Sequence, residues 1–192
     1  MIPFPDKKYD IIYADPAWNI VKSGDGYFGD GGVEGKAGTL KPDYPLMTTK
    51  EIMNLPVQDI SKDDCLLFMW IVSSMLEDSI EVGKTWGFTY STIAFVWEKQ
   101  IPIVATYTMR DCEICLLFKR GKIPRPIVSR SERQFLSCKR GKHSEKPLEI
   151  KHRIDKMFPI QSKIELFARP LPMFSDADGG WDYWGNEVET LP

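Results

Sequence analysis

The stretch from Tyr9 to Trp18, YDIIYADPAW, begins as an apolar run and ends in an Asp-Pro corner followed by a tryptophan. Its first six residues favour a β-strand and are apolar on both faces, as is typical of a central strand that is covered on both sides. Asp15 and Pro16 are turn residues, so the corner could simply let Trp18 fold back onto the core. Alternatively, it places a carboxylate, a carbonyl and an aromatic face at the end of a strand, where ligands of open α/β folds bind.

Strand-like and helix-like segments alternate along the rest of the chain. Further strands are expected at residues 65–72, 89–97, 112–119 and 162–168. One helix is expected between a cap at Ser73 or Ser74 and a stop at Gly87. A second is expected over 146–158, with an apolar stripe that consists of Leu148, Ile150, Ile154 and Phe158. The alternation predicts an α/β fold with a mostly parallel central sheet and helices on both faces.

The composition is typical of a soluble globular protein. The 192 residues are 43% hydrophobic and 27% charged, and a chain of this length usually forms one domain, so a single domain over 1–192 is expected. No apolar run approaches the roughly 20 residues that span a bilayer, and the first residues do not resemble a secretion signal. The four cysteines are too few and too irregularly spaced for a disulfide framework. We expect reduced thiols, a cytoplasmic location and no association with a membrane.

Two segments lack the periodicity of helices and strands. Residues 19–45 form a Gly-rich loop directly after the Asp-Pro corner, and loops of this length are usually functional or disordered. Residues 170–192 are irregular but rich in aromatic side chains. We expect Trp181 and Trp184 to be covered, because large aromatic side chains are rarely left in solvent.

A basic segment, residues 119–143, contrasts with the formal net charge of −2 of the whole chain. It contains nine Lys or Arg residues and a single acid, Glu132. Such a segment can steer a polyanion to one face of a protein, although it could equally be a solvated loop. The candidate nucleic-acid contacts are Lys119, Arg120, Lys122, Arg125, Arg130, Arg133, Lys139 and Arg140.

Two other chemistries have weak support. Cys112, Cys115, Cys138 and His143 would formally supply a zinc site. However, Cys112 and Cys115 lie three apart in an expected strand and therefore point to opposite faces. The glycines of residues 19–45 match neither a phosphate-binding loop nor a dinucleotide-binding motif. We expect no metal, and a zinc-stabilised nucleic-acid-binding module is the weaker alternative.

The corner at Asp15 suits methyl transfer to an exocyclic amine. The 6-amino group of adenine is a poor nucleophile, because its lone pair is delocalised into the ring. Asp15 and the Pro16 carbonyl could each accept one N–H of that amine, and Trp18 offers a face on which an extruded base can stack. A sulfonium methyl donor is already reactive, so alignment of donor and amine supplies much of the remaining acceleration without a metal.

The sequence also resembles a known family. DPAW, from Asp15 to Trp18, resembles the D-P-P-W signature of the adenine-N(6) methyltransferases that include the catalytic subunit of the eukaryotic mRNA adenosine methyltransferase. The compact phage and prophage DNA adenine methyltransferases of this family are the most similar. Ala17 departs from the signature but leaves the Pro16 carbonyl in place, so we expect activity to survive. Further matching segments follow in order over nearly the whole chain: LLFMWIVSSML, WGFTYSTIAFVWEK, CEICLLFKRG, HSEKPLE, KIELFARP and GWDYWGNEV.

The resemblance implies a Rossmann-like class I methyltransferase fold in circularly permuted order, in which the catalytic strand precedes the strand of the donor site. Asp15, Pro16 and Trp18 would form the catalytic motif. The donor would be S-adenosyl-L-methionine, whose carboxylate suits a cationic amine and whose ribose diol suits amide and carboxylate acceptors. The residues that the resemblance places around the donor are Asp15, Lys146, Arg169, Asn186 and Glu187.

The implied function is methyl transfer to the 6-amino group of adenine in DNA. We expect the protein to be a monomer or a homodimer. The basic segment fits either nucleic acid, so an RNA adenosine methyltransferase is an alternative. A catalytically silent nucleic-acid-binding subunit is another, because a fold does not by itself establish activity.

Overall fold

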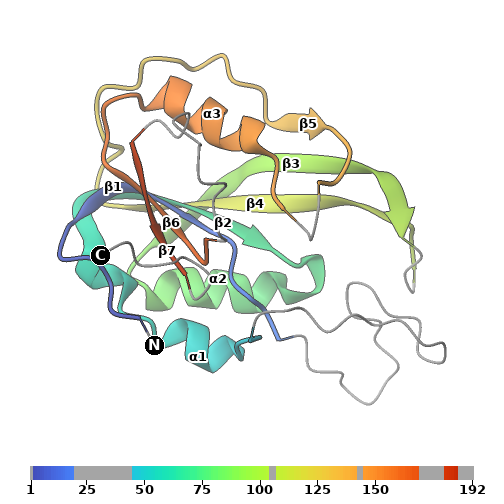
Figure 1. The fold of residues 1–192 in the computed structure, drawn as a ribbon, viewed down its shortest axis with the longest axis horizontal. Coiled ribbons are helices and arrows are strands. Elements are labelled where there is room, and N and C mark those ends of the chain that lie inside the picture. Colours follow the sequence, from blue (N-terminus) through green and yellow to red (C-terminus); the bar gives the residue numbers. More distant parts are fainter. Residues whose placement is uncertain (1, 20–44, 104–106, 142–144, 169–179, 186–192) are drawn as a thin grey trace.

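The computed structural model describes residues 2–19, 45–103, 107–141, 145–168 and 180–185. These residues build one seven-stranded sheet with the strand order β5-β3-β4-β2-β1-β6-β7 (Figure 1). The first strand of the chain, β1 (Tyr9–Ala14), therefore lies inside the sheet, as its apolar sequence predicts. The other strands are β2 (Ser61–Ile71), β3 (Thr89–Ile103), β4 (Arg110–Arg120), β5 (Phe135–Ser137), β6 (Lys163–Leu166) and β7 (Trp181–Trp184).

The sheet is mixed, with most neighbours parallel. β1 runs parallel to β2 and to β6, and the registers pair Ala14 with Met69 on one side and with Leu166 on the other. The strands β3 and β5 are also parallel, as are β6 and β7. Only β4 is antiparallel to its neighbours β2 and β3. The α/β class and the mostly parallel sheet are thus confirmed.

Helices cover both faces of the sheet, as predicted. α1 (Thr49–Met53) and α2 (Leu76–Thr85) lie on one face, and α3 (Leu148–Met157) lies on the other (Figure 1). Short 3₁₀ turns at Val57–Ile60 and Ser73–Met75 precede β2 and α2. Each face has its own hydrophobic core, one around Trp86 and the other around Trp70. None of the helices in these residues is long and apolar enough to cross a membrane.

The apolar stripe of α3 is predicted correctly except for Leu148. Ile150 and Ile154 are fully buried and Phe158 nearly so, whereas Leu148 is 48% exposed. Leu148 precedes Ile150 by two residues, which rotates its side chain by about 200° around the helix to the far side. The expected serine cap of α2 is also wrong, because α2 begins after Met75 without a side-chain cap. It does end before Gly87, whose φ of 84° lies in the left-handed region.

Three elements were missed, namely β5 in the expected loop over 119–143, α1 and β7, although the sequence carries a signal for α1. α1 begins with a capping box, in which Thr48 and the Glu51 side chain each bond the other's backbone N–H. A Thr-x-x-Glu spacing predicts such a start. β7 lies in the irregular tail, where Trp181 and Trp184 are both 6% exposed, so the expectation that they are covered is confirmed.

Candidate active site

The Asp-Pro corner lies at the carboxyl end of β1, where backbone hydrogen bonds pin it in place. The Met47 N–H donates to the Ala17 carbonyl over 2.8 Å, and the Asn19 N–H donates to the Met47 carbonyl over 2.8 Å. Residues 20–44 of the Gly-rich loop lie outside the described part of the chain. Asn19 and Met47 lie on either side of that gap, so these hydrogen bonds join its two sides directly beside the corner.

The Pro16 carbonyl keeps acceptor capacity for a ligand. It accepts the Trp18 N–H over 2.9 Å, which closes a tight turn. A carbonyl oxygen has two lone pairs, so this bond leaves one of them for a further donor. The geometry is therefore compatible with the acceptor role that the sequence predicts for Pro16.

Trp18 packs onto the core. Its side chain is 6% exposed and belongs to the core on the α1–α2 face of the sheet. The indole N–H is buried without a hydrogen-bond partner in the described residues. The fold-back interpretation of the corner therefore describes the position of Trp18, and its role as a stacking face for a base stays a prediction.

The structure brings Lys146 to Asp15, although 131 positions separate them in the chain. The Lys146 Nζ donates to Asp15 Oδ2 over 2.7 Å, and its side chain is only 13% exposed. Burial opposes the charged form of Lys146, but Asp15 and Glu113 together outweigh it and hold the pKa of this ammonium above its usual value. Two of the predicted site residues thus form one charged pair at the carboxyl edge of the sheet.

Glu113 and Lys99 extend this pair and were not predicted. Glu113 Oε2 lies 3.3 Å from Lys146 Nζ, and Glu113 Oε1 accepts from Lys99 Nζ over 3.2 Å. Lys99 is 2% exposed. Burial also opposes ionisation of Glu113, yet Lys146 and Lys99 hold the pKa of its carboxyl below the usual value. The four side chains alternate in charge as Asp15, Lys146, Glu113 and Lys99.

Strand alternation explains why these side chains meet. Asp15 lies two residues beyond Tyr13, Glu113 two residues before Cys115, and Lys99 two residues beyond Trp97. Tyr13, Cys115 and Trp97 all belong to the core on the α3 face. Because strand residues two apart share a face, the charged residues continue the same face beyond its apolar part. A charged residue two positions from a buried strand residue marks this face in the sequence, but the pattern does not distinguish a paired charge from one that faces solvent.

The remaining residues that are predicted to bind the methyl donor, Arg169, Asn186 and Glu187, lie outside the described residues. The residues that precede them, Ala168 and Gly185, lie close together at the ends of β6 and β7. The Ala168 N–H donates to the Trp184 carbonyl over 3.0 Å. A Cβ added to Gly185 would lie 2.4 Å from the Ala168 carbonyl oxygen, so only glycine fits this approach.

The structure divides the predicted nucleic-acid contacts between two ends of the sheet. Lys119 pairs with Leu66 and Arg120 with Cys65, whereas Trp70, one position beyond the partner of Ala14, pairs with Cys115. At about 3.3 Å per residue, Arg120 therefore lies about 17 Å along β4 from the level of Asp15. Lys122 follows it away from the site, and Arg120 itself donates to the Gln58 carbonyl. These three residues do not join Asp15.

The rest of the basic segment runs back along α3 to the site. Arg153 of α3 donates to the carbonyls of Arg133 and Phe135, so much of this expected loop is tethered to the helix. β5 then runs parallel to β3 toward the carboxyl edge, where Lys139 and Arg140 follow it and are exposed. Arg125 and Arg130 are exposed earlier in the segment.

The cysteines do not favour the zinc alternative. Cys115 is fully buried, and burial raises the pKa of its thiol well above the usual range, whereas a metal requires the thiolate. All four cysteines are free, and no group of three potential ligands occurs among the residues that the structure describes. His143 lies outside them.

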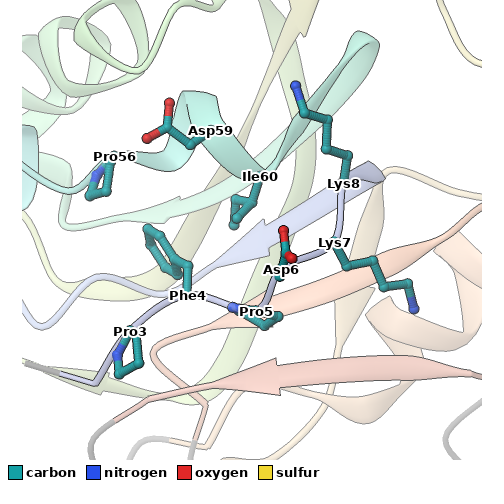
Figure 2. A pocket seen from close by; sticks show the side chains of 9 residues that line it. All are labelled: Pro3, Phe4, Pro5, Asp6, Lys7, Lys8, Pro56, Asp59 and Ile60. Carbon is teal, nitrogen blue, oxygen red and sulfur yellow. The ribbon is translucent and has the colours of Figure 1, made fainter.

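A surface depression of about 640 Å³ lies between the residues before β1 and the 3₁₀ turn before β2 (Figure 2). Pro3 to Lys8, which precede β1, line one side, and Pro56, Asp59 and Ile60 line the other. This depression is at the opposite end of β1 from Asp15. It therefore takes no part in the candidate active site.

Comparisons with known proteins show the family of the chain. The sequence model of the MT-A70 family matches residues 9–187. The type II methyltransferase M.MunI of Mycoplasma sp is 42% identical over 96% of this chain and 79% of its own length. The human N(6)-adenosine-methyltransferase catalytic subunit METTL3 is 26% identical over 96% of this chain but only 29% of its own. The mouse N(6)-adenine-specific methyltransferase METTL4 is 26% identical, over 95% and 38%. The chain belongs to the MT-A70 family of methyltransferases.

Proposed function

We propose that this methyltransferase transfers a methyl group from S-adenosyl-L-methionine to the 6-amino group of adenine in DNA. The observation that carries the proposal is the corner at Asp15, which lies at the carboxyl edge of the central strand with Lys146 Nζ at 2.7 Å. The carboxyl edge of an open α/β sheet is where ligands bind. Relatives whose names specify N(6) of adenosine or adenine support the target atom.

Asp15 and Pro16 would do the chemistry on the amine. The Asp15 carboxylate and the Pro16 carbonyl each accept one N–H, which draws the nitrogen lone pair out of conjugation and toward the donor. The donor contributes a methyl group on a sulfonium. As the nitrogen–methyl bond forms, the sulfur–methyl bond would break and leave its electron pair on the sulfur as a neutral thioether. Asp15 would take the proton that the amine loses, because a carboxylate is the basic group within reach.

The donor fits the charged residues beside the corner. An ammonium has three N–H groups, and the contacts of Lys146 with Asp15 and Glu113 account for two, which leaves one for the donor's carboxylate. The close approach of Gly185 to Ala168 supports a shared site for Arg169, Asn186 and Glu187 on the ribose side. β1 precedes β6 in the chain although the two are neighbours, which supports the permuted class I order.

The similarity to M.MunI supports DNA as the substrate, and the shared sheet supports one domain as the folded unit. The type II methyltransferase M.MunI is 42% identical, whereas METTL3, which is named for adenosine, is 26% identical. The strands of residues 9–184 share a single sheet, which supports one domain over 1–192. An adenine in a duplex must leave the stack to reach Asp15, as in other enzymes that act on bases.

A labelling experiment tests the proposal. The purified protein is incubated with a labelled methyl donor and, separately, duplex DNA, single-stranded DNA and RNA of matched sequence. Digestion to nucleosides identifies the methylated base. We expect N(6)-methyladenine in DNA, whereas label in RNA alone would replace the DNA proposal with the RNA alternative. An absence of label in every substrate would favour a silent subunit.

Lys139 and Arg140 are proposed to contact DNA phosphates beside the site. Replacing both with alanine should weaken binding similarly for all DNA sequences, because phosphate contacts carry no base information. The slope of log K against log salt should fall by about 1.8, at about 0.9 per phosphate contact. Replacing Lys119 and Lys122 removes the same charge at the far end of the sheet and serves as the matched control. Equal losses in both double variants would contradict the placement.

A further inference from the structure

We infer that Glu113 is a positioning residue that divides the Lys146 ammonium between two carboxylates and so keeps Asp15 available to the substrate amine. The inference rests on the proposed function. It adds Glu113, with Lys99 behind it, to a site that the sequence limits to the DPAW corner and the donor motifs.

The contacts show how Glu113 is held. Its two oxygens face different lysines, with Oε1 at 3.2 Å from Lys99 Nζ and Oε2 at 3.3 Å from Lys146 Nζ. The side chain of Lys99 is 3% exposed and that of Glu113 is 19% exposed. A charge that is this buried requires a partner, since an unpaired one costs far more than a pair. The ion pair with Lys99 therefore holds the Glu113 carboxylate in place, and the other oxygen of this carboxylate pairs with Lys146.

The position of Lys146 explains why the second carboxylate matters. With Asp15 alone, the ammonium would donate as fully as possible to the Asp15 oxygens, which are also the acceptors that the substrate amine needs. Glu113 draws the ammonium in the opposite direction, so one N–H goes to each carboxylate. The four charges sum to zero, which lets the network stay buried without an excess charge of either sign.

The Trp70 ring restricts the same ammonium from another side. Lys146 Nζ lies 5.7 Å from the centre of that ring, within the range of a cation–π contact. The Trp70 indole in turn donates to the Tyr13 hydroxyl over 2.6 Å. The ammonium is thus located by Asp15 just beyond β1, Trp70 on β2 and Glu113 on β4. Removing Glu113 leaves it with Asp15 as its sole carboxylate among these contacts.

Glu113→Gln tests the role of the charge, because glutamine keeps the shape of the side chain. We expect kcat to fall by about 100-fold, as for a displacement of a catalytic group by about 1 Å, with little change in KM for DNA. Glu81→Gln is the matched control, since it removes a carboxylate from an exposed pair with Lys84 on α2. This control should retain wild-type kcat. Wild-type kcat in Glu113→Gln would overturn the inference.

A double-mutant cycle separates positioning from a general loss of structure. If Glu113 acts through Lys146, then Glu113→Gln should lower the single-turnover rate by less than about twofold in a Lys146→Met background. A full additional 100-fold loss there would show that Glu113 acts independently of Lys146, and would also overturn the inference.

The Lys99 variants keep the test usable if Glu113→Gln does not fold. Lys99→Arg retains the charge behind Glu113 and should keep kcat within about tenfold of wild type, whereas Lys99→Met should lose about 100-fold. Equal kcat in the two variants would reject the network. Failure of the proposed function has a different signature, namely that the wild-type protein itself labels no adenine.

Discussion

Replacing Asp15 with asparagine is expected to slow methyl transfer about 10³-fold, the usual range for loss of a general base. Asparagine has the same shape, but it cannot take a proton, and its NH₂ group would meet the N–H groups of the adenine amine. Its oxygen can still accept from Lys146, so affinity for the methyl donor should stay within about threefold of wild type, as for loss of one modest contact. Single-turnover labelling of DNA measures the rate, and calorimetry measures donor binding.

Asp10→Asn is the matched control on the same strand. Asp10 is 18% exposed and accepts from Lys62 over 2.7 Å, so it resembles Asp15 in burial and pairing. It lies at the opposite end of β1, and its variant should methylate adenine at the wild-type rate. Equal labelling by wild type and Asp15→Asn would show that the DPAW corner is not the catalytic motif.

Replacing Lys146 with methionine should weaken donor binding by about 10- to 100-fold, because a hydrogen bond between charged groups contributes about 1.5–3 kcal/mol. The rate should also fall, since Asp15 and Glu113 would then face each other without the cation between them. Calorimetric titration with S-adenosyl-L-methionine measures the affinity. Thermal unfolding is measured alongside, because removing one member of a buried ion pair also destabilises the fold.

Lys146→Arg distinguishes the two contributions. Arginine keeps the charge, so the fold should retain most of its stability, while the larger guanidinium cannot occupy the position of the ammonium between two carboxylates. We expect near-normal unfolding with a reduced rate. Unchanged donor affinity in Lys146→Met would remove this lysine from the donor site.

The central part of the fold could be predicted because the hydrophobic pattern of its residues indicates which faces are buried. The run Tyr9–Ala14 is apolar on both faces, and a strand of that kind belongs inside a covered sheet. The same reasoning locates α3 through Ile150 and Ile154. The direction of β4 could not be predicted, because an apolar run has the same pattern in a parallel and an antiparallel strand. That direction places Lys119 and Arg120 at the far end from Asp15.

The candidate site likewise contains some residues that could be predicted from the sequence and others that could not. The motif residues Asp15, Pro16 and Lys146 are recognisable from the sequence, since their types suit the chemistry and their order matches the family. Glu113 and Lys99 lie in strands that resemble any other half-buried strand. Nothing local distinguishes a glutamate that holds a lysine from one that faces solvent.

By itself, the sequence determined the α/β class, the identity of the central strand and the carboxylate and carbonyl at its end that we propose as acceptors of an amine. These follow from local hydrophobicity and turn chemistry, which act over a few neighbouring residues. Only the tertiary structure decided which charges meet. The pairing of Lys146 with Asp15 and Glu113 depends on the sheet order and register, and these are set by packing between segments that lie far apart in the chain.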